Sequence, residues 1–119
     1  MSRFPAYRPR RMRRRDALRR LVRETHVIAE QLVQPLFVVP GTNVEQPVAS
    51  MPGIAQLSVD RAADEARRLV DAGVGSVLLF GIPESKDERG SGAVAPDGII
   101  PQALAAIRRA APELVLVTD

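Results

Sequence analysis

Two runs of consecutive apolar residues, at 77–80 (VLLF) and 114–117 (LVLV), constrain the fold more than any other feature of the chain. Strands with one face in water alternate apolar and polar residues, so unbroken runs of this length indicate strands covered on both faces. A third apolar segment, at 31–39, ends in Pro40-Gly41 and is also typical of a strand followed by a turn. Pro35 lacks a backbone donor, so we expect that part of the strand to lie at an end, at an edge or in an irregular stretch.

Helical patterns separate these strands. Ser58 and Asp60 are helix-capping types, and apolar residues follow at three- and four-residue steps as far as Gly73, which predicts a helix with a glycine stop. A second helix is expected at 99–110, ending before Pro112. Strands alternating with helices predict the α/β class, with parallel strands joined by crossover connections.

Such crossovers are right-handed in nearly all proteins, so both helices should pack on one face of the sheet. The other face would then be covered by the N-terminal segment, by another protein, or by further strands of a larger fold. The spacing of these elements matches a (β/α)8 barrel, which needs about 250 residues. We therefore expect residues 31–119 to form an incomplete barrel, with its first three β-strands and two helices, and residues 1–30 to form an extended arm.

The charge is concentrated in that arm. Residues 1–20 hold nine arginines and one acid, whereas the other 99 residues carry 8 basic and 13 acidic side chains. Such an arm can bind phosphate groups, or it can pair with acidic patches on a neighbouring copy. The chain has no cysteine, no apolar run near membrane-spanning length and no apolar signal core, so we expect a cytoplasmic protein.

Asp119 is a candidate site residue by its position, because it follows a strand at the edge where barrel enzymes assemble their chemistry. An acid at position 119 can orient a substrate amine, act as a base or support a metal, or it can be a solvated carboxylate without a role. Phe80 and Gly81 read first as core and turn residues. Lys86 lies in a charged, loop-like stretch, whereas a reactive lysine needs an apolar pocket or a cationic neighbour. His26 has no partner at metal-ligand spacing.

Several stretches in order and spacing make the chain resemble the N-terminal third of the porphobilinogen synthase (5-aminolevulinate dehydratase) family. They are Arg8-Pro9-Arg10-Arg11-Met12-Arg13, Leu21-Val22-Arg23-Glu24-Thr25, Pro35-Leu36-Phe37-Val38, Ser50-Met51-Pro52-Gly53, Leu79-Phe80-Gly81-Ile82-Pro83, Lys86-Asp87-Glu88-Arg89-Gly90-Ser91, Pro96-Asp97-Gly98, and Pro112-Glu113-Leu114 leading to Val117-Thr118-Asp119. The chain departs from the commoner bacterial pattern at Gly92 and Ala93-Val94-Ala95, where an acid and an Ala-Tyr-Asn run are usual.

The resemblance implies a lyase of haem biosynthesis that condenses two 5-aminolevulinate molecules into porphobilinogen with loss of water. It implies that Asp119 is an active-site aspartate and that Phe80 lies close to the substrate. The family's two Schiff-base lysines belong to later strands, and Lys86 matches neither. Its zinc or magnesium ligands also lie beyond Asp119, so none is expected in this chain, and these 119 residues should be inactive alone.

The family's arm wraps a neighbouring subunit in a homo-oligomer, commonly an octamer, which implies the same role for residues 1–30. The alternative hypothesis is a small non-enzymatic α/β module whose arginine-rich arm binds nucleic acid or an acidic partner. Only Phe4 and Tyr7 are interspersed with the arginines, which gives base stacking little support.

Overall fold

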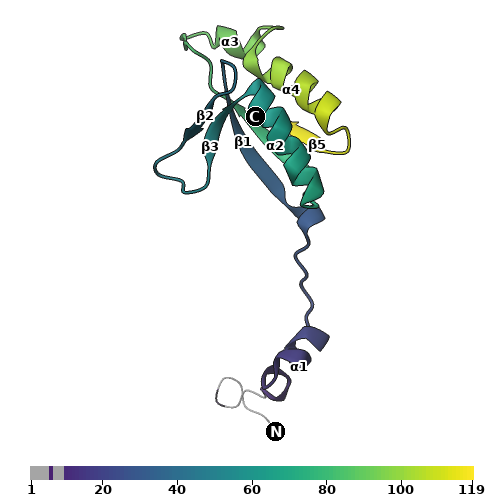
Figure 1. Ribbon diagram of the computed structural model, residues 1–119. Coiled ribbons are helices and arrows are strands. Elements are labelled where there is room, and N and C mark those ends of the chain that lie inside the picture. The colour runs from purple at the N-terminus through teal and green to yellow at the C-terminus, as the bar shows by residue number, and fades with distance from the viewer. Residues whose placement is uncertain (1–5, 7–9) are drawn as a thin grey trace.

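The computed structural model describes residue 6 and residues 10–119, and it shows an α/β fold built on one mixed sheet (Figure 1). The sheet has five strands in the order β2-β3-β1-β4-β5. Its strands are β1 (Val33–Val39), β2 (Glu45–Pro47), β3 (Ala55–Ser58), β4 (Ser76–Gly81) and β5 (Val115–Thr118). Its helices are α1 (Asp16–Leu21), α2 (Val59–Asp71), α3 (Ser91–Val94) and α4 (Ile99–Ala110), with short 3-10 turns at Arg11–Arg13 and Ala29–Gln31.

The three strands expected from the sequence are β1, β4 and β5, and they pair in parallel in chain order. The connecting helices α2 and α4 pack against each other and lie on one side of the sheet, as right-handed crossovers require (Figure 1). Between helices and sheet lies a core whose most deeply buried large side chains are Val38, Val77, Leu79 and Ile107.

Helix α2 ends as its sequence predicts. Gly73 has a φ of +82°, and its N–H donates to the Val70 carbonyl, while the N–H of Val74 donates to the Leu69 carbonyl. These two bonds form a Schellman motif, in which a left-handed glycine satisfies the last carbonyls of a helix. The chain then turns directly into β4.

The sheet has two strands that the sequence analysis did not predict. β2 and β3 form an antiparallel pair, and β3 also pairs in parallel with β1 beside residues 37–39. β2 is short and polar, so it carries no apolar pattern. Because β3 reaches β1 only beyond Leu36, Pro35 lies where one edge of β1 has no neighbouring strand, as its missing donor requires.

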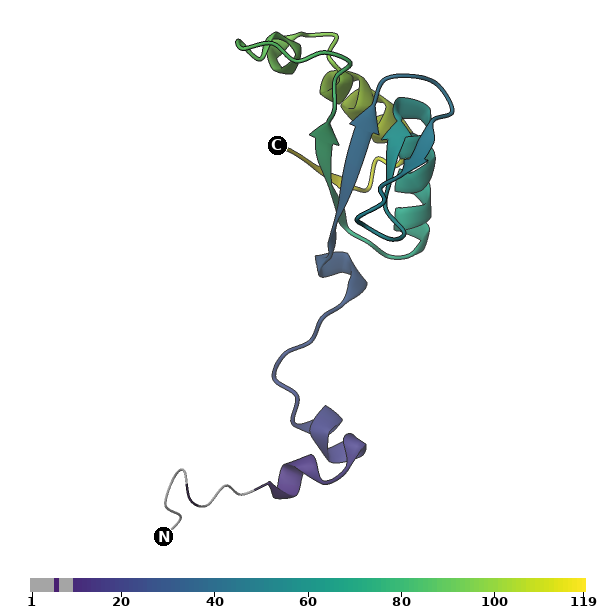
Figure 2. The same cartoon turned by 90° about the vertical axis from the view of Figure 1, so that its left-hand side faces the viewer.

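The sheet face opposite α2 and α4 is apolar and has no described element packed over it. Val33, Val115 and Val117 on this face are 52%, 61% and 41% exposed, and Phe37, Leu78 and Phe80 beside them are half-buried. The described part of the arm does not cover it, since residues 10–28 lead away from the sheet (Figure 2). Residues 10–28 are therefore excluded as the cover of this face, which was the first of the three explanations.

The arm makes the molecule elongated. The radius of gyration is 21.1 Å, whereas a compact chain of this length has about 14 Å. Helix α1 spans only six residues, and its apolar Leu21 is 76% exposed. Where the arm meets the body, the Glu30 carbonyl approaches Gly75 so closely that a side chain on residue 75 would collide with it. Arg3, Arg8, Phe4 and Tyr7 lie outside the described residues.

In the part of the chain that the structure describes, we find no helix that is long and apolar enough to span a membrane.

The burial of a side chain predicts how much its truncation lowers the free energy of unfolding. Leu79→Ala removes a fully buried side chain under α4, so it should lower the free energy of unfolding by about 2–5 kcal/mol. Val94→Ala, at a position 82% exposed, should change it by less than about 0.5 kcal/mol. Urea unfolding followed by circular dichroism measures both, and equal effects would contradict the assignment of the core.

Candidate active site

The carboxyl ends of β1, β4 and β5 meet at one edge of the sheet, and the candidate residues gather there. Phe37 of β1 is in register with Phe80 of β4, and Leu79 is in register with Thr118 of β5. The next residue along β5 is Asp119, so it extends the row of Phe37 and Phe80. Neighbours in register point to the same side of a sheet, which places all three on the face without helices.

Asp119 is held by its backbone and has an exposed side chain. Its N–H donates to the Leu79 carbonyl at 3.4 Å, which continues the β4–β5 ladder by one bond. It also borders a cavity of about 290 Å³ together with Thr118, Gly81 and the first turn of α4. A carboxylate at the mouth of such a cavity can accept a hydrogen bond or a proton from a bound amine.

Phe80 does not stand alone. Its ring stacks on that of Phe37, with centroids 5.6 Å apart and planes inclined by 26°. Both rings are half-buried. The family resemblance implies that Phe80 lies close to the substrate, whereas no sequence pattern assigns a role to Phe37. The available signal was a phenylalanine near the carboxyl end of each strand, two residues before the end of β1 and one before the end of β4.

Gly81 lets α4 approach the end of β4. A Cβ at this position would lie 2.8 Å from Ile99 Cγ2 and 2.8 Å from Ile100 Cγ1, closer than side chains tolerate. The absence of a side chain therefore sets the distance between the first turn of α4 and the strand, and so shapes the cavity beside Asp119.

Ser58 and Asp60, expected only as helix caps, anchor the loop that follows β1. The fully buried Ser58 hydroxyl accepts the Val44 N–H at 2.9 Å and donates to Asp60 Oδ1. Asp60 Oδ2 accepts the N–H of Asn43, which has a φ of +55°. The Ser58 hydroxyl, followed by the Asn43 N–H, lowers the pKa of Asp60 below its usual value.

The loop after β4 borders both this cavity and a second hollow of about 500 Å³, which extends towards Gly41. Asp87 holds the loop by accepting the Ser91 N–H at 2.8 Å, and hydrogen bonds from the Ser91 hydroxyl and N–H lower its pKa. Lys86 is exposed on this loop, so nothing there creates the apolar pocket that a reactive lysine needs.

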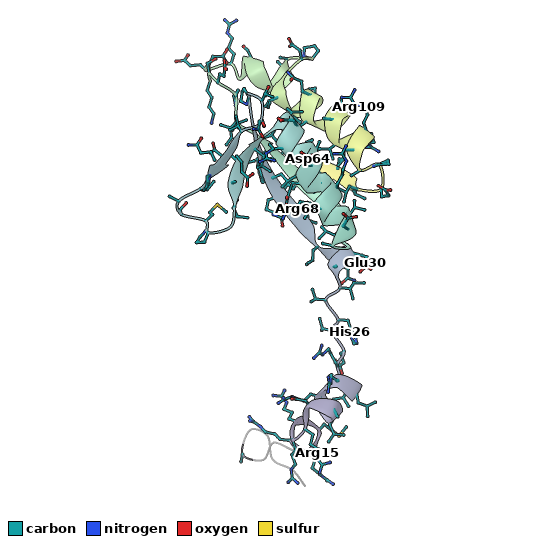
Figure 3. All side chains as sticks on the ribbon, in the orientation of Figure 1. Arg15, His26, Glu30, Asp64, Arg68 and Arg109 are labelled. Atoms are coloured by element: carbon teal, nitrogen blue, oxygen red, sulfur yellow. The ribbon has the colours of Figure 1, made fainter. Side chains whose placement is uncertain are left out.

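The remaining sequence candidate, His26, lies on the arm and is exposed (Figure 3). Among residue 6 and residues 10–119, no three His, Cys, Asp or Glu side chains come together in a way that could hold a metal ion. The described residues therefore place one carboxylate in a row with two stacked rings, and of these three residues only Asp119 lines the cavity.

This arrangement is an α/β fold in which a carboxylate and two stacked rings lie at the carboxyl ends of parallel strands. A family model described as delta-aminolevulinic acid dehydratase matches residues 6–119. The chain belongs to the delta-aminolevulinic acid dehydratase family.

Individual relatives agree with the family model. The chain is 47% identical to a delta-aminolevulinic acid dehydratase of Synechocystis sp. and 46% identical to one of Synechococcus elongatus, each over 98% of this chain and 36% of the relative. A crystal structure of the Toxoplasma gondii ME49 delta-aminolevulinic acid dehydratase, in complex with the reaction product porphobilinogen, superposes with a TM-score of 0.84. It is 33% identical and matches 95% of this chain and 32% of that one. The chain thus spans about a third of the length of these relatives.

The Asp60 anchor predicts a pH dependence. Because the folded pKa is lowered, the stabilisation is complete above the unfolded pKa and is lost as the pH falls through the folded value. The stability advantage of the native chain over Asp60→Asn should therefore be largest at neutral pH and shrink below about pH 4. Urea midpoints from pH 7 to pH 3 measure it. Asp71→Asn on the same helix serves as the matched control, and an advantage that does not change with pH would contradict the anchor.

Proposed function

We propose that this chain is the N-terminal third of a porphobilinogen synthase, which condenses two 5-aminolevulinate molecules into porphobilinogen with loss of water. The observation that carries the proposal is the family match over residues 6–119. It is supported by the fold shared with a relative whose crystal structure contains porphobilinogen. In its family the activity is that of a lyase, a hydro-lyase that eliminates water.

The barrel assignment supplies a reason for the open sheet face. In this proposal residues 31–119 form the first three strands and two helices of a (β/α)8 barrel, and β1, β4 and β5 turn their apolar face towards its interior. Such interiors are filled by layers of branched apolar side chains contributed by the strands. The half-buried and exposed residues of this face have that composition.

We assign Asp119 as an active-site carboxylate and Phe80 as a substrate contact. Asp119 borders the cavity at the catalytic end of the strands, where it would orient a substrate amine or accept its proton. The Schiff-base lysines of the family are assigned to residues outside this chain, because Lys86 is its only lysine and is exposed.

Members of the family are metal-dependent in general. The described residues do not fit a metal centre, since they bring no set of ligands together. Zinc or magnesium would therefore be held by residues outside this chain, and no step here is assigned to a metal.

The arm is proposed to hold subunits together in a cytoplasmic homo-oligomer, such as an octamer. Its described part exposes apolar side chains at Leu21, Val27 and Ile28 as well as arginines, including Arg15 (Figure 3). A surface that combines apolar and basic groups suits the acidic body of a second copy better than a nucleic acid, which would need mainly charge.

Turnover tests the proposed activity. The protein encoded by the complete reading frame should form porphobilinogen from 5-aminolevulinate, and the 119-residue chain should form none. Asp119→Asn in the complete protein should lower kcat/KM by about 10²-fold or more, because a positioned acid or base contributes that much. Asp71→Asn, on the helix side, is the control. Unchanged turnover in Asp119→Asn would overturn the role of that residue.

Removal of residues 1–30 tests the arm. The truncated complete protein should sediment as a smaller species than the intact one in analytical ultracentrifugation. Intact protein should show no binding to unrelated duplex DNA at 150 mM salt. Tight DNA binding that weakens steeply with salt, together with an unchanged oligomer after truncation, would favour the non-enzymatic alternative.

A further inference from the structure

The pair formed by Phe37 and Phe80 stands out on the sheet face without helices. The chain has four aromatic residues, and two of them stack here, while Phe4 and Tyr7 lie outside the described residues. The neighbouring in-register pair on the same face, Pro35 and Leu78, is aliphatic. The rings are therefore placed at one level of this face, the level that Asp119 shares.

Phe80 occupies the middle of that row. On one side its ring meets Phe37 with centroids 5.6 Å apart, and on the other side β5 leads to Asp119. An aliphatic side chain at position 37 would reach less far and would offer no flat face, which would leave the Phe80 ring free to turn about its side-chain bonds. Phe37 thus limits which way the face of the Phe80 ring points relative to the carboxylate.

Neither ring belongs to the core between the sheet and the helices, which is built from Leu36, Val38, Leu79 and their neighbours. The pair consequently contributes little to packing α2 and α4. The rings lie instead on the face without helices, in the same row as Asp119.

We infer that Phe37 is a positioning residue for catalysis, which acts by holding the ring of Phe80 in the orientation that the substrate meets. This inference rests on the proposed function, because it requires Phe80 to contact 5-aminolevulinate. Phe37 itself need not touch the substrate.

A double-mutant cycle in the complete protein tests it, with steady-state turnover of 5-aminolevulinate measured for Phe37→Leu, Phe80→Leu and the double variant. The stacking of an aromatic pair contributes a free energy that corresponds to about a two- to tenfold change in an equilibrium constant. Phe37→Leu should therefore raise KM by about that factor. In the Phe80→Leu background, the same change at position 37 should have almost no further effect on KM. Phe37→Tyr, which keeps the ring, should restore the native KM.

Leu78→Val is the matched control, since it trims an apolar side chain on the same face and keeps both rings. It should lower the thermal midpoint and leave KM unchanged. Additive effects of the two leucine substitutions, or a rise in KM for Leu78→Val equal to that for Phe37→Leu, would overturn the positioning role while leaving the proposed function intact. An intact protein that forms no porphobilinogen would overturn both.

Discussion

Parallel pairing of β1 with β4 and of β4 with β5 is the constraint on which the rest of the structure depends. Each pairing requires a crossover, and the shared handedness of the crossovers sends α2 and α4 to the same side. That choice creates the core around Leu79 and Ile107 and leaves the opposite face apolar and open. It also brings the three carboxyl ends together, which is why Phe37, Phe80 and Asp119 lie in one row although they are 43 and 39 positions apart along the chain.

Two sets of interactions hold the candidate site at this edge of the sheet. The backbone supplies the first, since the ladder continues through the N–H groups of Ile82 and Asp119 and keeps the strand ends aligned. Side chains supply the second: Ser58 and Asp60 fix the loop after β1, and the missing side chain of Gly81 admits the first turn of α4. The carboxylate and the rings are therefore presented by a frame whose polar groups are largely paired with each other.

Sequence patterns predicted the parts of this fold that carry a local signal. The apolar runs located β4 and β5, and the spacing up to Gly73 located α2, because burial on both faces and helical periodicity leave marks on adjacent residues. β2 and β3 left no such mark, as they are short and are stabilised by pairing with each other and with β1. The stacking of Phe37 on Phe80 and the contact of Asp60 with Asn43 depend on register and loop geometry, which no single stretch of sequence encodes. The roles of Asp119 and Phe80 remain predictions, although the register places the two residues side by side.

The contact between Glu30 and Gly75 fixes where the arm leaves the body, at the amino ends of β1 and β4. The candidate site occupies the other end of the same strands, a full strand length away. The arm can therefore bind a partner without obstructing a molecule that enters at the carboxyl ends of the strands. Under the proposed function, changes in the arm can therefore alter assembly without altering substrate binding, so the two properties can change separately among relatives.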